Sequence, residues 1–313
     1  MEFRRLGESG LVVSVVGLGT NNLGMKLDDE QSSAVVHAAL EEGITLIDTS
    51  DSYGESEQRL GRLLEGRRDD VVLATKFGSD VRRRGGDNGE DWDARGSRRY
   101  IRRAVESSLT RLRTDWIDLY QLHRPDPATP IEETLSALSD LVGAGKVRYI
   151  GSSNLAGWQV ADAEWTSRSR GLERFVSAQN EYSLLKRDVE DDLVPALEQY
   201  GIGLLPFFPL ASGLLTGKYR RGQPPPKGSR IEAWGRESVL TDRVFDAVEG
   251  LEAFAAERSL SVLDVAIGGL AAQPAVASVI AGATSPEQVR ANVAAGGWQP
   301  SLDDLAQLDQ LTA

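Results

Sequence analysis

The sequence predicts an α/β protein of the (β/α)8 TIM-barrel class, with a single domain over residues 1–313. Eight short apolar runs rich in Ile, Val and Leu are each followed by a segment with helical periodicity. The runs do not alternate apolar with polar residues, which is typical of parallel strands buried on both faces. Eight such units favour a closed barrel over an open, doubly wound sheet.

The first residues of the chain predict a β-hairpin outside this repeat. Two short apolar arms flank a Gly-Glu-Ser-Gly turn at 7–10, which is a hairpin signature. We expect this hairpin to close the bottom, or N-terminal end, of the barrel.

The repeat then runs in order along the rest of the chain. The expected strands are 15–20, 44–50, 71–76, 117–123, 147–153, 175–182, 203–210 and 278–283. The expected helices are 29–42, 55–64, 97–112, 130–144, 156–168, 189–200, 241–258, 262–272 and 285–295, with a short C-terminal helix from about 302. Glycines at 43, 145 and 201 follow the ends of three helices and mark the turns back to strands.

Two long loops interrupt this rhythm, at 78–96 and 211–240. Both follow strands, so both should rise from the C-terminal face of the barrel, where long loops are either lids or solvated excursions. Trp92 lies within the polar first loop, which favours a role in a pocket wall.

Composition limits the classes of function. Hydrophobic residues make up 41% and charged residues 26%, as in soluble globular proteins. The formal net charge of −12 argues against nucleic-acid and anionic-membrane partners. No apolar stretch reaches the roughly 18 residues of a membrane span, and the N-terminus does not have the pattern of a secretory signal. We therefore expect a cytoplasmic protein.

The residues that could hold a metal are few. The chain has no cysteine, which excludes disulfides, thiolate catalysis and cysteine metal sites. Its two histidines, His37 and His123, occur in very different contexts, so we expect no metal site.

Four residues form the candidate catalytic site. Asp48, Lys76 and His123 each end a different apolar run, and Tyr53 follows Asp48 by five residues. Active sites of α/β barrels gather at the C-terminal ends of the strands. The four side chains should therefore converge on one mouth and form a proton-transfer site.

The chemistry of these residue types suits an acid at Tyr53. A tyrosine has a pKa of about 10, and a nearby ammonium lowers it by stabilising the phenolate. Lys76 can supply that charge, Asp48 can pair with Lys76, and His123 can reach the phenol or a substrate oxygen. Tyr53 is thus a candidate general acid for a carbonyl oxygen. Taken singly, a lysine at a strand end can be a solvated residue and an aspartate a helix cap.

At these residues the chain resembles the aldo-keto reductases, in particular bacterial members related to the potassium-channel β-subunit branch. The segment from Gly43 to Glu57 is similar to the first signature of that family. Further similar segments follow in order and cover nearly the whole chain: 74–76, 122–126, 150–154, 179–183, 209–219 and 282–288.

The resemblance implies NADP(H) bound across the barrel mouth without a Rossmann fold. Ser153, Asn154 and Gln179 would bind the carboxamide, since such side chains offer a donor and an acceptor. Phe207 would stack on the nicotinamide ring. The other implied cofactor contacts are Thr20, Leu210, Gly213, Lys218, Gly282, Thr284, Gln288 and Asn292. The substrate pocket would include Asn21 and Trp92.

The chain departs from many NADPH-selective members, which carry Lys and Arg at the positions of Gly282 and Gln288. The bidentate clamp on the 2′-phosphate is therefore not assured, and NAD(H) is a possible cofactor. Arg230, after the proline run, could supply the missing charge.

The main hypothesis is an NADP(H)-dependent oxidoreductase that reduces an aldehyde or ketone by hydride transfer, with Tyr53 as the acid. A second hypothesis is a nicotinamide-binding regulatory protein with little turnover, but the channel β subunits carry Asn at the position of His123. A third is an aldolase or isomerase that forms a Schiff base on Lys76. The identity of the carbonyl substrate and the oligomeric state stay open.

Overall fold

A computed structural model describes residues 1–81, 88 and 90–312. Part of the first long loop, 82–87 and 89, therefore lies outside the described residues, as does residue 313.

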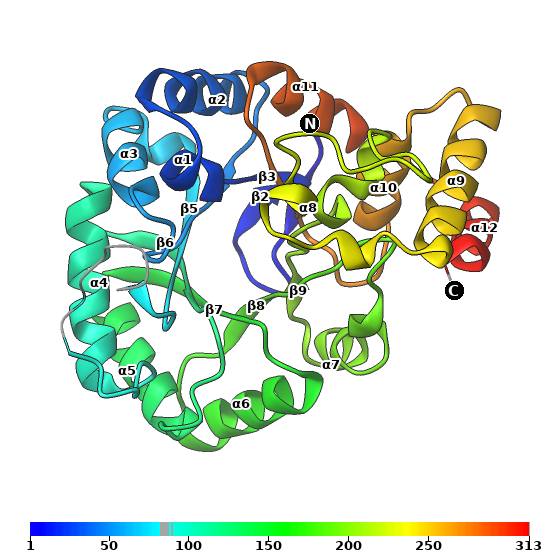
Figure 1. The fold of residues 1–313 in the computed structure, drawn as a ribbon. Helices are drawn as coiled ribbons and strands as arrows, with labels where there is room; N and C mark the ends of the chain where they lie inside the picture. Colours follow the sequence, from blue (N-terminus) through cyan, green and yellow to red (C-terminus); the bar gives the residue numbers. More distant parts are fainter. Residues whose placement is uncertain (82–87, 89, 313) are drawn as a thin grey trace.

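The centre of the molecule is an eight-stranded sheet in the order β10-β3-β4-β5-β6-β7-β8-β9, in which every neighbouring pair is parallel. Its strands are β3 (Val16–Gly19), β4 (Leu46–Asp48), β5 (Val72–Phe77), β6 (Ile117–Leu122), β7 (Val147–Ser153), β8 (Phe175–Gln179), β9 (Gly203–Leu204) and β10 (Val279–Gly282). Figure 1 shows the strands arranged around a central axis, with helices outside them.

Strands β9 and β10 complete the ring. Leu204 forms a parallel bridge with Val276, and Phe207 forms another with Ile280. The Ile280 amide donates to the Pro206 carbonyl at 2.9 Å. The prediction of a (β/α)8 barrel is thus confirmed.

The helices surround the sheet and follow the strands in chain order (Figure 1). They are α1 (Asn21–Met25), α2 (Asp29–Glu41), α3 (Ser56–Leu63), α4 (Arg98–Leu112), α5 (Ile131–Gly143), α6 (Gly157–Arg170), α7 (Leu193–Tyr200), α8 (Arg230–Ala233), α9 (Asp242–Glu257), α10 (Val262–Ala271), α11 (Pro286–Ala295) and α12 (Leu302–Thr312). Short 3-10 turns lie at η1 (Arg68–Asp70), η3 (Asp188–Glu190), η4 (Ala211–Thr216) and η5 (Glu237–Val239). No described helix combines the length and the apolar character needed to cross a membrane.

The N-terminal hairpin pairs β1 (Phe3–Arg5) with β2 (Val12–Ser14), as predicted. Its side chains Leu6 and Val13 are fully buried in the cluster that fills the inside of the barrel, together with Leu46 and Leu119. The Ser14 amide donates to Thr45 Oγ1 at 2.9 Å, immediately before β4. The hairpin therefore plugs the N-terminal end of the barrel.

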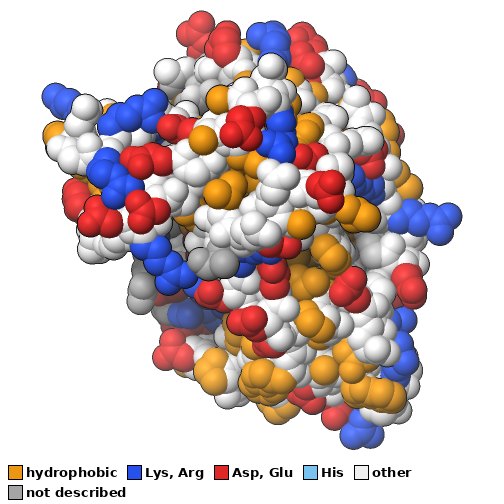
Figure 2. Space-filling model, turned by 90° about the vertical axis from the view of Figure 1, so that its right-hand side faces the viewer, with side chains coloured by type: hydrophobic (Ala, Val, Ile, Leu, Met, Phe, Trp, Pro, Cys, Tyr) orange, Lys and Arg blue, Asp and Glu red, His pale blue; other side chains and the backbone are white. Residues whose placement is uncertain are grey.

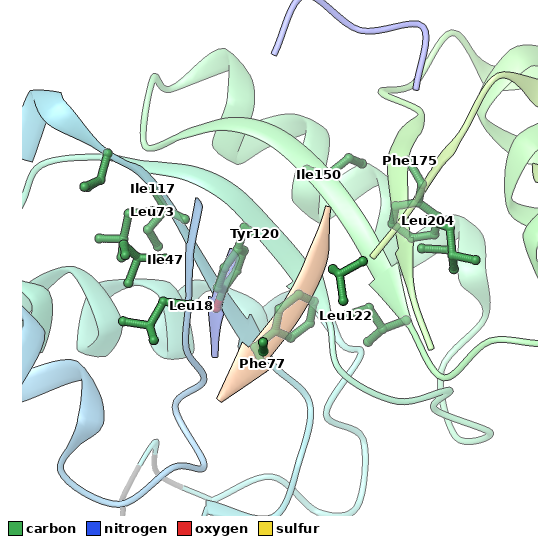
Figure 3. Packing of buried hydrophobic residues seen from close by; sticks show 14 of the residues in the cluster. Leu18, Ile47, Leu73, Phe77, Ile117, Tyr120, Leu122, Ile150, Phe175 and Leu204 are labelled. Carbon is green, nitrogen blue, oxygen red and sulfur yellow. The ribbon is translucent and has the colours of Figure 1, made fainter. Parts of the chain in front are cut away.

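A second apolar layer lies between the strands and the surrounding helices. Figure 3 shows outward-facing side chains from successive strands, among them Leu18, Ile47, Leu73 and Ile150. In this layer the Phe77 ring stacks on Tyr120, with ring centroids 4.7 Å apart. Because one face of each strand packs inside the barrel and the other in this layer, the strands are rich in apolar residues and do not alternate apolar with polar positions.

The structure differs from the sequence prediction at a few element ends. The strand expected over 203–210 is only Gly203–Leu204, since Pro206 and Pro209 have no N–H for a ladder. The helix expected from 189 begins at Leu193, after the 3-10 turn η3. Helices α1 and α8 lie in segments expected to be loops.

Candidate active site

A buried ion pair joins the ends of β4 and β5. Asp48 is the last residue of β4, and its Oδ2 accepts a hydrogen bond from Lys76 Nζ at 2.6 Å. Lys76 also donates to the Thr49 carbonyl at 2.8 Å, and its side chain is 0% exposed. The charge is therefore held in one place, with two oxygens offsetting its desolvation.

The second oxygen of Asp48 is held by two amides. Its Oδ1 accepts from Gln121 Nε2 at 3.2 Å and from Gln179 Nε2 at 2.9 Å. Gln121 is the partner of Lys76 in the β5–β6 register, so these two side chains come from adjacent strands at the same level. The carboxylate is held by one cation and two amide donors, which is the set a buried carboxylate needs.

Tyr53 meets this pair from the loop between β4 and α3. The Lys76 ammonium lies 5.1 Å from the centroid of the Tyr53 ring and hydrogen-bonds the Tyr53 side chain. Burial by itself lowers the pKa of Lys76, but the charge of Asp48 and the hydrogen bonds to Asp48 and Tyr53 raise it above its ordinary value of 10.5. The lysine is thus a fixed ammonium beside the phenol.

His123 completes the group from the end of β6. Its ring meets the edge of the Tyr53 ring, with centroids 5.9 Å apart and planes at 83°. Its Nδ1 lies 3.0 Å from Ser50 Oγ. All four residues of the predicted catalytic site therefore lie together at the C-terminal ends of the strands.

Sequence reasoning missed two supporting residues, Ser50 and Gln121. Each has a signal in the chain: Gln121 is a polar residue two positions before His123 in an apolar strand, and Ser50 is two positions after Asp48. Residues two apart point to the same side of a strand, so both could have been placed on the inner face.

The three residues predicted to bind an amide lie next to this group. Ser153 Oγ donates to the Gln179 backbone carbonyl at 2.8 Å, across the β7–β8 pair. Asn154 Nδ2 bonds Ser153 Oγ at 2.9 Å and the His123 carbonyl at 3.0 Å. Asn154 has a left-handed backbone, with φ of 59°. The strand end is thus tied to the His123 backbone.

A cluster of three cations lies farther along the same face. Burial lowers the pKa of Lys218, and the charges of Arg230 and Lys26 lower it further. The Arg230 guanidinium lies 5.2 Å from the ring centroids of both Phe208 and Trp234. Within the described part of the chain, none of the three cations forms an ion pair with a carboxylate. Such a cluster is suited to an anionic group.

The predicted adenosine end is built from the end of β10 and the start of α11. Gln288 Oε1 accepts from the Thr284 amide at 2.8 Å and from Thr284 Oγ1 at 3.1 Å. Gly282 is exposed, and Asn22 Nδ2 lies 3.5 Å from where its Cβ would be. Asn292 is buried on α11.

The other residues predicted to contact the cofactor come from different segments of the chain. Thr20 is fully buried, and its Oγ1 donates to the Asp48 carbonyl at 2.8 Å. Leu210 and Gly213 lie in the turn that contains η4, where Gly213 has φ of 95°. Phe207 is bridged to both Glu181 and Ile280, at the rim of the barrel.

The two predicted substrate residues differ in their surroundings. Asn21 opens α1 directly after β3, and its Oδ1 lies 3.9 Å from the Cβ position of Gly282. Trp92 is 62% exposed, and its ring contacts the Arg99 guanidinium at 4.0 Å from the ring centroid. Its contact is thus with α4. Among the described residues, no group of three or more acidic or histidine side chains could hold a metal ion.

Comparison with known proteins adds a separate finding. The sequence profile of the Aldo/keto reductase family matches residues 15–313. The chain is 35% identical to the uncharacterized oxidoreductase YrpG of Bacillus subtilis (strain 168), over 94% of this chain and 91% of that protein. It is 34% identical to a probable voltage-gated potassium channel subunit beta of Arabidopsis thaliana, over 99% and 95% of the two chains. It is 33% identical to the L-glyceraldehyde 3-phosphate reductase of Escherichia coli (strain K12), over 99% and 92%.

Proposed function

This chain belongs to the aldo/keto reductase family, and we propose that it is an NADP(H)-dependent oxidoreductase that reduces an aldehyde or ketone to an alcohol. One observation carries the proposal: the buried Lys76 ammonium is bonded to both Asp48 and Tyr53, with the His123 ring against the phenol. This is an acid with a fixed cation beside it, in a site sheltered from water.

In the proposed mechanism, Tyr53 donates its phenolic proton to the oxygen of the substrate carbonyl. Lys76 stabilises the phenolate that remains, because its positive charge is held close by Asp48 and the Thr49 carbonyl. His123, against the edge of the phenol, orients the carbonyl oxygen by a hydrogen bond. These groups act in the transition state, where the oxygen becomes negative.

The residues present fit a nicotinamide dinucleotide. Ser153, Asn154 and Gln179 have amide and hydroxyl groups beside the catalytic group and would hold the carboxamide. The cation cluster of Lys218, Arg230 and Lys26 suits phosphate groups. When bound, the cofactor supplies the hydride. The cation cluster also supports NADP(H) over NAD(H), since only the former has a 2′-phosphate.

The Schiff-base alternative is disfavoured by the state of Lys76. A nucleophilic lysine must be a free amine, which requires a lowered pKa. The pKa of Lys76 is raised, because Asp48 and Tyr53 outweigh the effect of burial. Lys76 therefore acts as a charge and not as a nucleophile.

The test is the variant Tyr53→Phe, which removes the acid and keeps the ring. We expect kcat for the reduction of a reactive aldehyde by NADPH to fall by roughly 10² to 10⁴. The Kd for NADPH, followed by nicotinamide fluorescence, should change little. Reduction at the parental rate would contradict the role of Tyr53. Tight NADPH binding by the parental protein with no turnover of any aldehyde would instead support a regulatory protein.

A further inference from the structure

A second buried carboxylate, Asp51, lies close to the proposed catalytic group, and this inference rests on the proposed reductase function. Asp51 is 5% exposed and lies in the loop between Asp48 and Tyr53. Its Oδ1 lies 3.3 Å from Ser50 Oγ, and Ser50 Oγ lies 3.0 Å from His123 Nδ1. A continuous chain of hydrogen bonds therefore runs from Asp51 to His123.

The other oxygen of Asp51 is bonded to an amide whose orientation is fixed. Asn88 Nδ2 donates to Asp51 Oδ2 at 2.9 Å, and Arg111 donates to Asn88 Oδ1 at 3.5 Å. Since a guanidinium can only donate, Asn88 must turn its oxygen toward Arg111 and its NH2 toward Asp51. If Asp51 carries a proton, the proton is therefore on Oδ1, the oxygen that faces Ser50.

The charges around Asp51 favour that proton. Glu57 of α3 is 1% exposed and forms the direct ion pair with the nearby cation, since Arg111 Nε donates to Glu57 Oε2 at 2.7 Å. Thr75 also donates to Glu57, at 2.6 Å. Two buried carboxylates share one arginine, and the one without the direct ion pair is the one to keep a proton.

The shift in Asp51 agrees with this geometry. Burial above all, and then the charge of Glu57, raise its pKa, while Arg111, Asn88 and Ser50 lower it; the net effect is a rise from 3.8 to about 8. Lys76, whose backbone carbonyl accepts from the Asp51 amide at 3.2 Å, has its ammonium paired with Asp48.

Two tyrosines also face Asp51, Tyr100 from α4 and Tyr120 from β6. Burial and the charge of Asp51 raise the pKa of Tyr100 to about 12 and that of Tyr120 well above 10. Both phenols therefore stay neutral while Asp51 titrates.

Through the Ser50 hydroxyl, the protonation of Asp51 determines which ring nitrogen of His123 carries the proton. A hydroxyl has one proton and two lone pairs, and the Ser52 amide occupies one lone pair at 3.1 Å. When Asp51 is protonated, it donates to Ser50, and Ser50 donates to His123 Nδ1. When Asp51 is ionised, it can only accept, so Ser50 turns its proton to Asp51 and accepts from His123. The Ser52 hydroxyl, 2.9 Å from Ser50 Oγ, must turn its own proton away in both states, because the Ser52 amide, Asp51 and His123 already use the proton and both lone pairs of Ser50.

We propose that Asp51 is a positioning residue that, through Ser50, keeps the proton of neutral His123 on Nε2, the ring nitrogen that can donate to the substrate carbonyl oxygen. Loss of the Asp51 proton reverses the chain, moves the imidazole proton to Nδ1 and removes that donor. The reductase is therefore switched down at alkaline pH by a residue that does not touch substrate.

The direct test observes, by NMR, which ring nitrogen of His123 carries the proton. It requires neither bound cofactor nor enzymatic activity. The chain has two histidines, and His37 is exposed on α2, so [15N]histidine labelling gives two ring systems that His37→Asn assigns. In the parental protein we expect protonated Nε2 on His123 at pH 7 and protonated Nδ1 well above pH 8. Asp51→Asn should keep Nε2 protonated throughout, because its amide NH2 donates to Ser50 at every pH. Ser50→Ala should remove the switch. A parental tautomer that does not change across this range, or Nδ1–H at pH 7, overturns the proposal.

The kinetic test compares pH profiles. In the parental enzyme kcat for aldehyde reduction should fall roughly tenfold per pH unit once Asp51 is ionised. The ratio of kcat at pH 9 to kcat at pH 7 should rise several-fold in Asp51→Asn, whereas Asp162→Asn, an exposed change on α6, should keep the parental ratio. An unchanged ratio in Asp51→Asn overturns the proposal. A protein without reductase activity would refute the proposed function, and the tautomer measurement would still decide this inference.

Discussion

At the scale of single residues, the site depends on charges that are buried but matched. Lys76 is 0% exposed, yet the pKa of its ammonium is raised, because Asp48 and Tyr53 more than offset the burial that lowers it. Asp48 in turn has two amide donors besides Lys76. Neither charge is stable alone at this depth, so the pair must be treated as one unit.

This coupling predicts a strongly non-additive double-mutant cycle. Lys76→Met leaves the Asp48 carboxylate buried without its cation, and we expect a loss of about 3–5 kcal/mol in the free energy of unfolding. Asp48→Asn combined with Lys76→Met should lose less than Lys76→Met alone, because no charge is left unpaired. Urea unfolding at pH 7, followed by circular dichroism, measures all four proteins. Additive losses would show that the two residues contribute independently.

The buried carboxyl of Asp51 predicts a stability that depends on pH. Burial, with Glu57 adding to it, raises its pKa from 3.8 to about 8 in the folded protein. The folded state therefore holds a proton that the unfolded state releases, so this contribution is complete below about pH 4 and is lost as pH rises toward 8. Asp51→Asn has no such loss. Its free energy of unfolding should therefore exceed that of the parental protein by an amount that grows to at most roughly 4 kcal/mol at pH 7. Unfolding curves at pH 5, 7 and 9 test this, with Asp162→Asn as the control. Parallel pH dependence of Asp51→Asn and the parental protein would refute it.

The residues of the candidate site were predictable in part. Asp48, Lys76 and His123 end apolar runs, so the fold class alone placed them on one face. Asp51 had no such mark, because its surroundings depend on a contact with Asn88, which no local pattern relates to it. Polar networks between distant segments are set by tertiary packing, and a single sequence does not display them.

At the scale of elements, the order of strands and helices followed from periodicity, but some ends did not. The pattern of β9 continued as an apolar run to 210, while the regular strand ends at Leu204 and gives way to single backbone bonds, such as Leu205 N–H to the Ala178 carbonyl at 2.8 Å, and to a bridge at Phe207. Prolines at 206 and 209 explain this, since they cannot donate to a neighbour. Helix α1 has only five residues, too few for a helical period to be visible.

The missed helix α1 lies against the loop that carries Tyr53. A Cβ on Gly24 would lie 1.6 Å from the Tyr53 carbonyl oxygen and 2.8 Å from the Ser56 amide nitrogen. Both are backbone atoms, so no side-chain rotation could relieve the clash. Helix α1 and the loop that carries Tyr53 are thus in contact at a distance that only glycine permits.

We predict that Gly24→Ala displaces Tyr53 and lowers kcat for aldehyde reduction at least tenfold, because a shift of about 1 Å in a catalytic group has effects of this order or more. The matched control is Gly143→Ala at the end of α5, where an added Cβ meets nothing within 4 Å. That control should keep its activity and be equally or slightly more stable, by up to about 1 kcal/mol. Steady-state kinetics and thermal unfolding of the two variants suffice. Equal activity in both would mean that the loop does not depend on α1.

At the scale of the whole molecule, a net charge of −12 coexists with a local cluster of cations. Figure 2 shows acidic and basic side chains mixed across one face. Arg221 is an example, since it lies within 3.0 Å of Asp242, Asp246 and Glu249. Arg230 differs: it lies against two aromatic rings, and burial lowers its pKa, partly opposed by Tyr219. A cation that has no carboxylate partner among the residues that the structure describes is available to a bound anion.

This contrast predicts how the protein distinguishes the two nicotinamide cofactors. Arg230→Met should raise the Kd for NADPH about tenfold or more, the value of one charge-assisted contact to phosphate, and should change the Kd for NADH much less. Arg236→Met is the matched control, because Arg236 lies over the same Trp234 ring, at 5.0 Å, but is not among the charges that lower the pKa of Lys218. Titrations followed by nicotinamide fluorescence, at low and high salt, measure both cofactors. Salt should weaken NADPH binding more in the parental protein than in Arg230→Met, because the variant lacks the charge pair between Arg230 and phosphate that salt screens. Equal weakening of NADPH and NADH would place Arg230 on the part that the two cofactors share, and the 2′-phosphate would then need another partner.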